Sequence, residues 1–404
     1  MDSTSKGIGA VISWFPALYW IVSEPAGITY RTILRILKKA VGRPQTSRLP
    51  WSTLILALGL VGVGALFITS AHSYALARKH VIFTGLGLLA FLGAAFFHYR
   101  HLAHLSSVLY AGGIISLALL PILGTGPGAQ RWYNLRFFMV QPSQPMKLIV
   151  ALALADYLSW RKKPSFTDGV LPALVIVAVP AVLIAIQPDL GTALLFVPLF
   201  VAVTFLAGVS LRHLLVVALA GAVLASAAWL TPGVMQDYQK KRVTGFIYPE
   251  SMPRSSAVYN AEKATLAIAS GGVYGRGWGE GQLSQLGRIP ESHTDFIFAV
   301  IAEEWGFTGC VAIILAYLAI IGNMCRVTAM ARDRFGRLLA GGTTALLASQ
   351  VLLHVAINLR LGPITGLTLP LVSYGGSSLL TTFTGLGLVA NVAMRKSFMF
   401  GPET

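Results

Sequence analysis

The chain has 404 residues, of which 55% are hydrophobic and only 11% are charged, and its formal net charge is +16. Soluble domains usually contain about 25% charged residues, so this composition excludes a soluble globular protein. The positive charge does not indicate nucleic acid binding, because the basic residues are dispersed along an apolar chain with no soluble domain to display them. We interpret them as signals of membrane orientation with some attraction to anionic lipid, and we expect no nucleic acid partner.

The first 50 residues contain a shorter apolar stretch at 8–22. A basic run follows this stretch and no small-residue cleavage site comes after it, so a signal peptide is not indicated. We favour an amphipathic helix that lies on the membrane, with an eleventh span as the alternative. The expected organisation is a cytoplasmic or interfacial segment at 1–50, a membrane domain at 51–398 and a tail at 399–404.

Ten apolar runs follow, each close to the length of about 20 residues that crosses a hydrocarbon core of roughly 30 Å as a helix. They cover residues 52–71, 80–98, 103–123, 145–160, 169–186, 190–208, 212–230, 296–322, 338–357 and 376–394. We therefore predict an all-α integral membrane protein of about ten transmembrane helices, with one long extracytoplasmic loop at 231–295. The fourth run is short and the fifth and sixth almost touch, so a division that merges or splits spans stays open.

Lys and Arg in short loops favour the cytoplasmic side of a membrane. One short connection contains Arg161, Lys162 and Lys163, and another contains four arginines between 326 and 337. Both connections lie inside when the N-terminus is cytoplasmic, and an even number of spans returns the C-terminus to the same side. We expect a multi-pass protein with both termini in the cytoplasm.

Under this topology nearly all irregular polar segments lie on the outer face. They cover residues 128–132, 141–144, 187–189, 231–295 and 361–378. Irregular backbone at membrane depth is tolerated only where protein or water satisfies its peptide groups, so we expect these segments to line one outward-facing cavity. The glycine-rich stretch at 271–281 has no preceding strand and no βαβ unit, so its glycines indicate tight turns rather than a nucleotide-binding loop.

His293, Thr294 and Asp295 place an imidazole, a hydroxyl and a carboxylate at the outer boundary of the eighth run. Ionisable groups at membrane depth are costly and indicate function by default. Thr294 or Asp295 also suits the N-cap of the helix, and Asp295 can fill both roles, because apolar surroundings raise the basicity of a carboxylate and suit it to general-base work. Glu303 and Glu304, about two turns further along, face different sides of a helix, so at most one shares the cavity of Asp295.

Lys147 shares a helix face with Gln144 and is a candidate cation for an anionic substrate. Asp189 precedes the sixth run and is either a partner of Lys147 or an N-cap. Asp156, near Arg161, is interpreted as structural. The two cysteines lie about four turns apart on one helix and form neither a disulfide with each other nor a metal site alone.

Ser373 and Ser377 lie in a small-residue stretch before the last run. No strand and no evident histidine partner accompany them, so they do not indicate a hydrolase nucleophile. Residues of this size pack against the start of a helix or donate hydrogen bonds to a substrate.

Several of these segments form motifs in a fixed order. They are GAQRW at 128–132, QPS at 141–143, QPDLGTA at 187–193, HTDFIFAVIAEEWG at 293–306 and PITGLTLPLVSYGGSS at 363–378. At these motifs, and over residues 52–398, the sequence resembles the SEDS family (shape, elongation, division and sporulation) of bacterial cell-wall proteins, which includes RodA and FtsW. Residues 238–242 and 290–293 are more similar to RodA.

The resemblance implies a peptidoglycan glycosyltransferase of the bacterial cytoplasmic (inner) membrane that polymerises lipid II, the disaccharide-pentapeptide carried on undecaprenyl pyrophosphate. Asp295 matches the catalytic aspartate of the family. It is expected to deprotonate the 4-hydroxyl of the acceptor's N-acetylglucosamine, which attacks the anomeric carbon of the donor's N-acetylmuramic acid and inverts the α-linkage to β. Arg131, Lys147 and Arg242 are candidates for stabilising the leaving pyrophosphate. The other residues expected to contact substrate are Asp189, His293, Ser373 and Ser377.

The resemblance also implies a class B penicillin-binding protein, a transpeptidase, as partner within the cell-shape or division machinery. We expect the rod-shape (elongation) role, with the division-type polymerase as an alternative. A divalent cation, Mg²⁺ or Mn²⁺, stays open because the sequence shows no dedicated ligand set. A flippase for lipid-linked precursors and a scaffold that recruits a polymerase are the alternatives from other classes; the outer position of Asp295, away from the bilayer midplane, favours the enzyme.

Two positions depart from the family's pattern. Gln144, followed by Pro145, stands where the family usually has a glutamate, so the usual partner of Lys147 is missing and any proton-relay or metal role of that glutamate is in doubt. His354 stands where relatives often have asparagine.

Overall fold

A computed structural model describes residues 49–395, except 127–129, 135, 137, 232–234 and 249–256. The stretch at 8–22, the tail at 399–404 and two residues of the first motif, Gly128 and Ala129, lie outside the described residues. The elements up to residue 186 are α4 (Trp51–Ala71), α5 (Tyr74–Phe96), α6 (Tyr99–Leu123), β1 (Tyr133–Asn134), β2 (Met139–Val140), α7 (Ser143–Ser159), the π-helical turn η2 (Phe166–Val170) and α8 (Leu171–Ile186). The later elements are α9 (Leu190–Leu194), α10 (Phe196–Leu206), α11 (Leu211–Leu230), α12 (Asp237–Ile247), α13 (Ala257–Gly271), α14 (Gln282–Gln285), α15 (Ile297–Ala329), α16 (Arg334–Asn358) and α17 (Gly376–Met394).

The predicted fold class is confirmed. Each of the ten predicted runs is helical, and the part of the chain that the structure describes contains eight helices long and apolar enough to cross a membrane. The fourth run is α7, which has 17 residues, and the sixth is divided into α9 and α10 over Leu190–Leu206. The fourth and sixth runs are thus the ones at which the sequence left the division into spans open.

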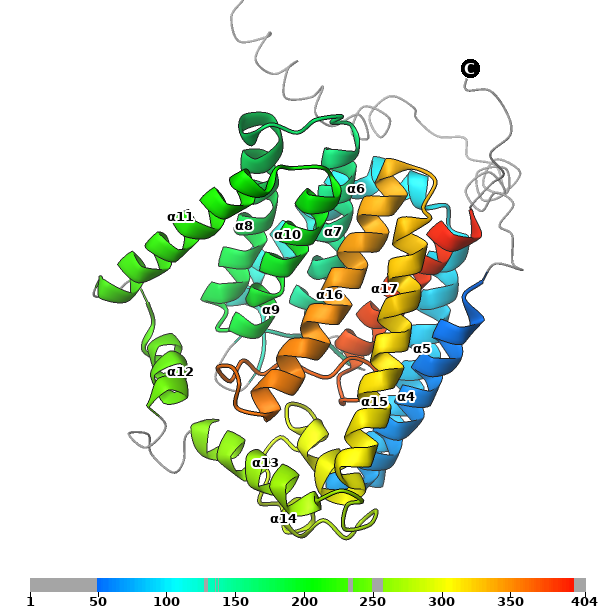
Figure 1. Cartoon of the computed structure of the whole chain (residues 1–404), viewed down its shortest axis with the longest axis vertical. Helices are drawn as coiled ribbons and strands as arrows, with labels where there is room; N and C mark the ends of the chain where they lie inside the picture. The colour runs from blue at the N-terminus through cyan, green and yellow to red at the C-terminus, as the bar shows by residue number, and fades with distance from the viewer. Residues whose placement is uncertain are drawn as a thin grey trace, which may run out of the picture.

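The helices α16 and α17 form the centre of the bundle (Figure 1). Within the most apolar stretch of each helix, 83% of α17 and 67% of α16 is buried, whereas α11 has no buried residue. The helix α17 packs along α5, and Gly387 permits their close approach because a Cβ at that position would lie 2.5 Å from the carbonyl oxygen of Phe91. The motif at 363–378 therefore leads directly into the best-packed helix of the protein.

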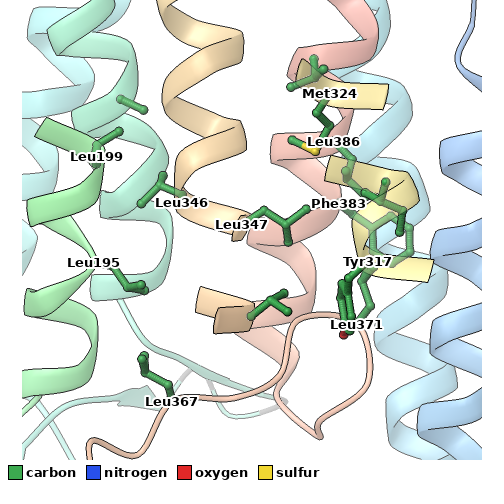
Figure 2. Close-up of a cluster of buried hydrophobic side chains, with 14 of the residues drawn as sticks. Leu195, Leu199, Tyr317, Met324, Leu346, Leu347, Leu367, Leu371, Phe383 and Leu386 are labelled. Carbon is green, nitrogen blue, oxygen red and sulfur yellow. The ribbon is translucent and has the colours of Figure 1, made fainter. Parts of the chain in front are cut away.

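Apolar side chains hold the irregular segment that precedes α17, residues 361–375, against the helices. Figure 2 shows Leu367 and Leu371 of this segment at the outer end of a buried layer to which α10, α15, α16 and α17 contribute. The hydroxyl of Tyr317 in α15 donates a hydrogen bond to the carbonyl of Pro370. Leu371 is held at φ 72°, a conformation that side chains other than glycine rarely adopt. Tight packing thus imposes one conformation on a segment without regular hydrogen bonding.

The helix α15 is interrupted where the sequence predicted one continuous span from 296 to 322. Gly306 has φ 66° and ψ −162°, so residues 297–305 and 307–329 are two helical pieces joined by a break. A side chain at Gly306 would collide with the backbone of Val273, since a Cβ there would lie 2.6 Å from its carbonyl oxygen. The break explains how a helical segment of 33 residues, about 50 Å if it were straight, fits this fold.

The long outer loop contains three helices, α12, α13 and α14, which lie at one end of the bundle (Figure 1). The helix α13 packs against α15 and α16. The hydroxyl of Tyr238 in α12 donates to the carbonyl of Ala185 at the end of α8 (3.1 Å). These contacts place the loop near the end of α8 and against α15 and α16.

Candidate active site

Asp295 lies in a turn immediately ahead of α15. Glu291 adopts φ 52°, and its carbonyl accepts hydrogen bonds from the backbone N–H groups of Thr294 (3.1 Å), Asp295 (3.1 Å) and Phe296 (3.3 Å). The helix begins at Ile297 with Phe296 in the N-cap position and no side-chain cap, so the predicted capping role of Thr294 or Asp295 is wrong. The carboxylate of Asp295 is therefore not used to start the helix.

Two polar side chains of α16 and of the segment before α17 hold this turn in place. Asn358 Nδ2 donates to the carbonyl of Asp295 (3.1 Å), and Ser373 Oγ donates to the carbonyl of Thr294 (2.6 Å). Gly366, at φ 73°, lies against the carboxylate, because a Cβ built there would be 3.4 Å from Asp295 Oδ2. The reacting group predicted from the sequence is thus set in a rigid frame, to which Asn358 is an addition that the motifs did not indicate.

The pKa of Asp295 is raised to about 6, chiefly because the carboxyl group is buried and secondly because Glu291 is nearby. Arg242 lies close enough to oppose this shift and Asp189 adds to it. Burial disfavours the charged form of a carboxyl group, and a base is most effective when its pKa approaches the working pH. Asp295 consequently combines ionisation at neutral pH with more proton affinity than an exposed aspartate has.

Arg131 and Arg242, two of the three predicted cations, lie near each other and near two carboxylates. Burial and then the charge of Arg131 lower the pKa of Arg242, while Asp295 and Asp189 raise it. Arg131 Nη2 donates to the carbonyl of Pro188 (2.7 Å), but its Nε and the Nη1 of Arg242 are buried without a hydrogen-bond partner. Buried guanidinium N–H groups without acceptors indicate an anionic ligand that supplies the missing oxygen atoms.

Lys147, the third predicted cation, interacts with the charge of Asp189, as one of the two predicted alternatives has it, but its hydrogen bond is made to another residue. Its Nζ is buried between α7 and α16 and donates to Gln350 Oε1 (2.8 Å). Gln350 Nε2 in turn donates to the carbonyl of Thr368 (2.9 Å). Gln144, at the departure from the family pattern, is buried one turn away with its Oε1 unpartnered. The charges that shift the pKa of Asp295 are Glu291, Arg242 and Asp189, and Lys147 is not among them.

Asp189 is the N-cap of α9, as predicted, and it has other partners as well. Oδ1 accepts from the N–H of Thr192 (3.1 Å), whereas Oδ2 accepts from Gln141 Nε2 (2.9 Å) and Ser143 Oγ (3.0 Å). Ser377 at the start of α17 accepts from the N–H of Gln141 (3.1 Å). Asp189 and Ser377 therefore join the starts of α7, α9 and α17.

His293 lies beside a second imidazole that the sequence did not single out. Its ring stands edge-to-face with that of His72 (4.6 Å between centroids) and lies 6.0 Å from the ring of Tyr374. Burial, followed by the charge of His72, lowers the pKa of His293. A neutral, stacked His293 is suited to contact an uncharged part of a substrate. Ser373, by contrast, uses its hydroxyl within the protein, donating to Thr294 and accepting from the N–H of Leu369 (2.8 Å).

A cleft with about 330 Å³ of empty space adjoins Arg242, and Arg360 also lines it. Sequence reasoning missed Arg360, although an arginine directly after an apolar helix and before Gly362 and Pro363 was a signal of an outer-face cation. Among the described residues no group of three or more His, Cys, Asp or Glu is arranged to hold a metal ion. The protein side chains present thus provide cations for an anionic ligand rather than a complete metal site.

Glu303 and Glu304 belong to the outer loop rather than to the cavity of Asp295. Glu303 accepts from the N–H groups of Leu283 (2.7 Å) and Ser284 (3.0 Å), and Glu304 accepts from the N–H of Gly279 (3.0 Å). Neither glutamate shares the cavity, which is consistent with the prediction that at most one would. Both glutamates are instead used to hold the segment around α14.

The chain was compared with protein families and with known proteins. The profile of the FtsW/RodA/SpoVE family, described as cell cycle protein, matches residues 48–398. The chain belongs to this family. Peptidoglycan glycosyltransferase MrdB of Escherichia coli is 34% identical over 349 residues, which cover 86% of this chain and 94% of MrdB. Stage V sporulation protein E of Bacillus subtilis is 32% identical over 354 residues, covering 84% of this chain and 95% of that protein.

Solved structures agree with this assignment. A chain of a peptidoglycan synthase complex that coordinates polymerisation and crosslinking has a TM-score of 0.75 and 32% identity, with 86% of this chain and 99% of that chain covered. Rod shape-determining protein RodA of Thermus thermophilus has a TM-score of 0.65 and 30% identity, with 86% and 98% covered. The predicted membership of the SEDS family, with greater similarity to RodA, is confirmed.

Proposed function

We propose that this protein polymerises lipid II into glycan strands during rod-shape cell-wall synthesis, with Asp295 as its general base. The class of activity, peptidoglycan glycosyltransferase, follows from membership of the family and from relatives that bear this name. The observation that carries the role of Asp295 is its combination of a pKa raised to about 6 with two nearby arginines, each of which has a buried N–H group without an acceptor among the described residues. A base and an anion site side by side are what this transfer requires.

The reaction needs a proton acceptor and a stabilised leaving group. Ionised Asp295 takes the proton of the acceptor's 4-hydroxyl. At the same time the oxygen of that hydroxyl forms a bond to the anomeric carbon of the donor. The bond between that carbon and the pyrophosphate oxygen breaks, its electron pair stays on the pyrophosphate, and the linkage changes from α to β. Negative charge then grows on the pyrophosphate, where the N–H groups of Arg131 and Arg242 that lack protein acceptors lower its energy.

A divalent cation fits this site only together with substrate. Mg²⁺ is commonly held by one or two carboxylates plus the phosphate oxygens of a substrate. Asp295 and Asp189 are the carboxylates near Arg242, but Oδ1 and Oδ2 of Asp189 already accept hydrogen bonds. We therefore propose that Mg²⁺ or Mn²⁺, where it acts, arrives with the pyrophosphate.

The proposed orientation places Asp295 at the outer face of the bacterial inner membrane and both termini in the cytoplasm. The arginines between 326 and 337 lie at the opposite end of α15 and α16 from Asp295, as the preference of basic loops for the cytoplasm requires. The similarity to a chain of a peptidoglycan synthase complex supports a class B penicillin-binding protein as partner. Its transpeptidase activity would consume the glycan strands at this outer face.

The test is polymerisation of labelled lipid II by the purified protein, with and without its penicillin-binding partner. Asp295→Asn should lower the rate of polymerisation by about 10²–10⁴-fold, because a positioned general base contributes an acceleration of that size. Asp237→Asn, a change at an exposed aspartate of α12, is the matched control and should polymerise as the parent does. Full activity of Asp295→Asn would disprove the base assignment. Lipid movement across vesicles without polymer in any partner context would instead identify a flippase.

A further inference from the structure

Arg360 is a second cation in the lining of the cleft beside Arg242. The cleft lies between α12, α13 and the end of α16, with Arg242 and Arg360 in its lining. Phe246, Ile357 and Ile364 form apolar walls between them. Two arginines in the lining of one cleft provide several guanidinium N–H donors, which is the kind of group that binds phosphate oxygens.

Neither arginine finds enough acceptors within the described protein. Nη1 of Arg242 is buried and unpartnered, and no hydrogen bond or ion pair of the Arg360 guanidinium to a described residue is observed. Other arginines in the fold are used differently: Arg161 donates to the carbonyls of Tyr157 and Asp168. The difference matters because the buried N–H group of Arg242 is costly without an acceptor, while the guanidinium of Arg360 is left available to a ligand.

The backbone conformation of Arg360 also indicates a functional role for its side chain. Arg360 follows α16 with φ 55°, a left-handed conformation that costs free energy for any residue with a Cβ. Strain of this kind at a position that needs only to end a helix is a reason to look for a function of the side chain. Glycine would end the helix without strain, and an arginine there projects a cation into the cleft.

The balance of charges around Asp295 is a further argument for a role of Arg360 in binding an anion. Arg131 and Arg242 are accompanied by three carboxylates, Asp189, Asp295 and Glu291, so these groups carry no surplus positive charge when all are ionised. A pyrophosphate ester carries at least two negative charges near neutral pH, and its binding needs excess cation. Arg360 is the additional cation in the lining of the cleft.

We propose that Arg360 and Arg242 together bind the pyrophosphate of a polyprenyl pyrophosphate, one guanidinium to each phosphate group. The inference rests on the proposed function, because it assigns this cleft to the donor's leaving group. The apolar walls then contact the first part of the lipid chain, and Arg131 completes the cation set on the side of Asp295. Arg360 is thus a substrate-binding residue supplied by this chain in addition to the motif arginines.

The test uses Arg360→Gly in the full-length protein in detergent. Glycine prefers the conformation found at this position, so the variant loses the cation without new backbone strain. Affinity for undecaprenyl pyrophosphate is measured, with undecaprenyl monophosphate and undecaprenol as comparison ligands. Arg288→Ala removes an exposed arginine of the outer loop outside the cleft and is the matched control.

We expect Arg360→Gly to weaken undecaprenyl pyrophosphate binding roughly tenfold, the value of a charge-assisted hydrogen bond, and to weaken monophosphate binding less. Arg288→Ala should bind as the parent does, and inorganic pyrophosphate should compete with the lipid. Equal affinity of the parent and Arg360→Gly for undecaprenyl pyrophosphate overturns the proposal, as does a parent that binds undecaprenol equally well. Asp295→Asn separates the two proposals: it should retain binding while losing polymerisation, so a wrong base assignment and a wrong pyrophosphate site give different results.

Discussion

Asp295 and the pair Glu303 and Glu304 are carboxylates of one short stretch of chain that the fold uses in opposite ways. Both glutamates are completely buried, and both accept backbone N–H groups from the loop around α14. The carboxylate of Asp295 accepts no backbone N–H group of the described residues and lies beside Arg242 instead. The family motif contains all three acids, so residue type alone does not separate them.

The difference shows what a buried acid needs in order to remain reactive. A carboxylate whose oxygens are occupied by fixed N–H donors stabilises the fold and has little to offer a substrate. Asp295 is held through its main chain by Asn358, so its side chain stays available for a proton. A general base requires a backbone that is held in place and a carboxylate oxygen that is free to accept a proton.

The largest expected effect that tests this comparison is on stability. Glu303→Ala should lower the free energy of unfolding by about 3 kcal/mol, because it leaves the N–H groups of Leu283 and Ser284 without acceptors in a buried site. Asp295→Asn should leave the melting temperature unchanged or raise it, because ionisation of an acid whose folded pKa is raised opposes folding at neutral pH. Thermal unfolding in detergent measures both. A loss of stability in Asp295→Asn as large as in Glu303→Ala would contradict the comparison.

The arrangement of spans was predictable because each helix carries its own signal. Ten apolar runs became ten helical segments, and the motif at 293–306 marked Asp295 without any structure. The break at Gly306 was not predictable, because glycine is common in transmembrane helices and the backbone that excludes a side chain there, at Val273 and Gly275, is distant in the sequence. The contacts of Glu303 and Glu304 with residues 279–284 are likewise set by the tertiary fold.

The sequence predicted several basic residues near the site, but not which groups each of them contacts. Arg131, Arg242 and Lys147 were all selected by charge, yet Lys147 is paired with Gln350, about 200 positions away in the sequence, and neither residue's pattern indicates the other. Arg360 directly precedes the segment 361–378 that glycine and proline marked as irregular, and only its φ and its place in the cleft lining show its importance. Tertiary pairing, rather than local sequence, decides which cation serves the site.

The next effect is on the rate as a function of pH. Asp295 must be ionised to accept a proton, and its pKa is about 6, so polymerisation should fall about tenfold per unit of pH below 6 and level off above 7. An ordinary exposed aspartate would place this fall near pH 4. Initial rates of lipid II polymerisation between pH 4.5 and 8 measure the profile. A flat profile down to pH 5 would show that Asp295 is not the group whose ionisation limits the reaction.

A smaller effect is expected from Glu291, the nearest acid to Asp295. The charge of Glu291 raises the pKa of Asp295, but burial contributes more. Glu291→Gln should therefore move the midpoint of the pH profile to lower values by less than one unit, which increases the rate at pH 5 by roughly twofold to fivefold. Glu280→Gln, at an exposed glutamate of the same loop, is the control and should leave the midpoint in place. A shift in the opposite direction would mean that Glu291 does not act through its charge.

The smallest effect tests whether the buried lysine and the base form one site. Gln144→Glu restores the acid that the family usually has at this position, beside Lys147. If Lys147 served as a cation for Asp295, a new carboxylate next to it would change the reaction strongly. Lys147 instead bonds to Gln350 and interacts with Asp189, and it is absent from the charges that shift the pKa of Asp295. Because Lys147 does not act on Asp295 directly, Gln144→Glu should keep the polymerisation rate within about twofold and the pH midpoint unchanged. A moved midpoint would show that the two buried groups are coupled, and the cation set of the site would then have to include Lys147.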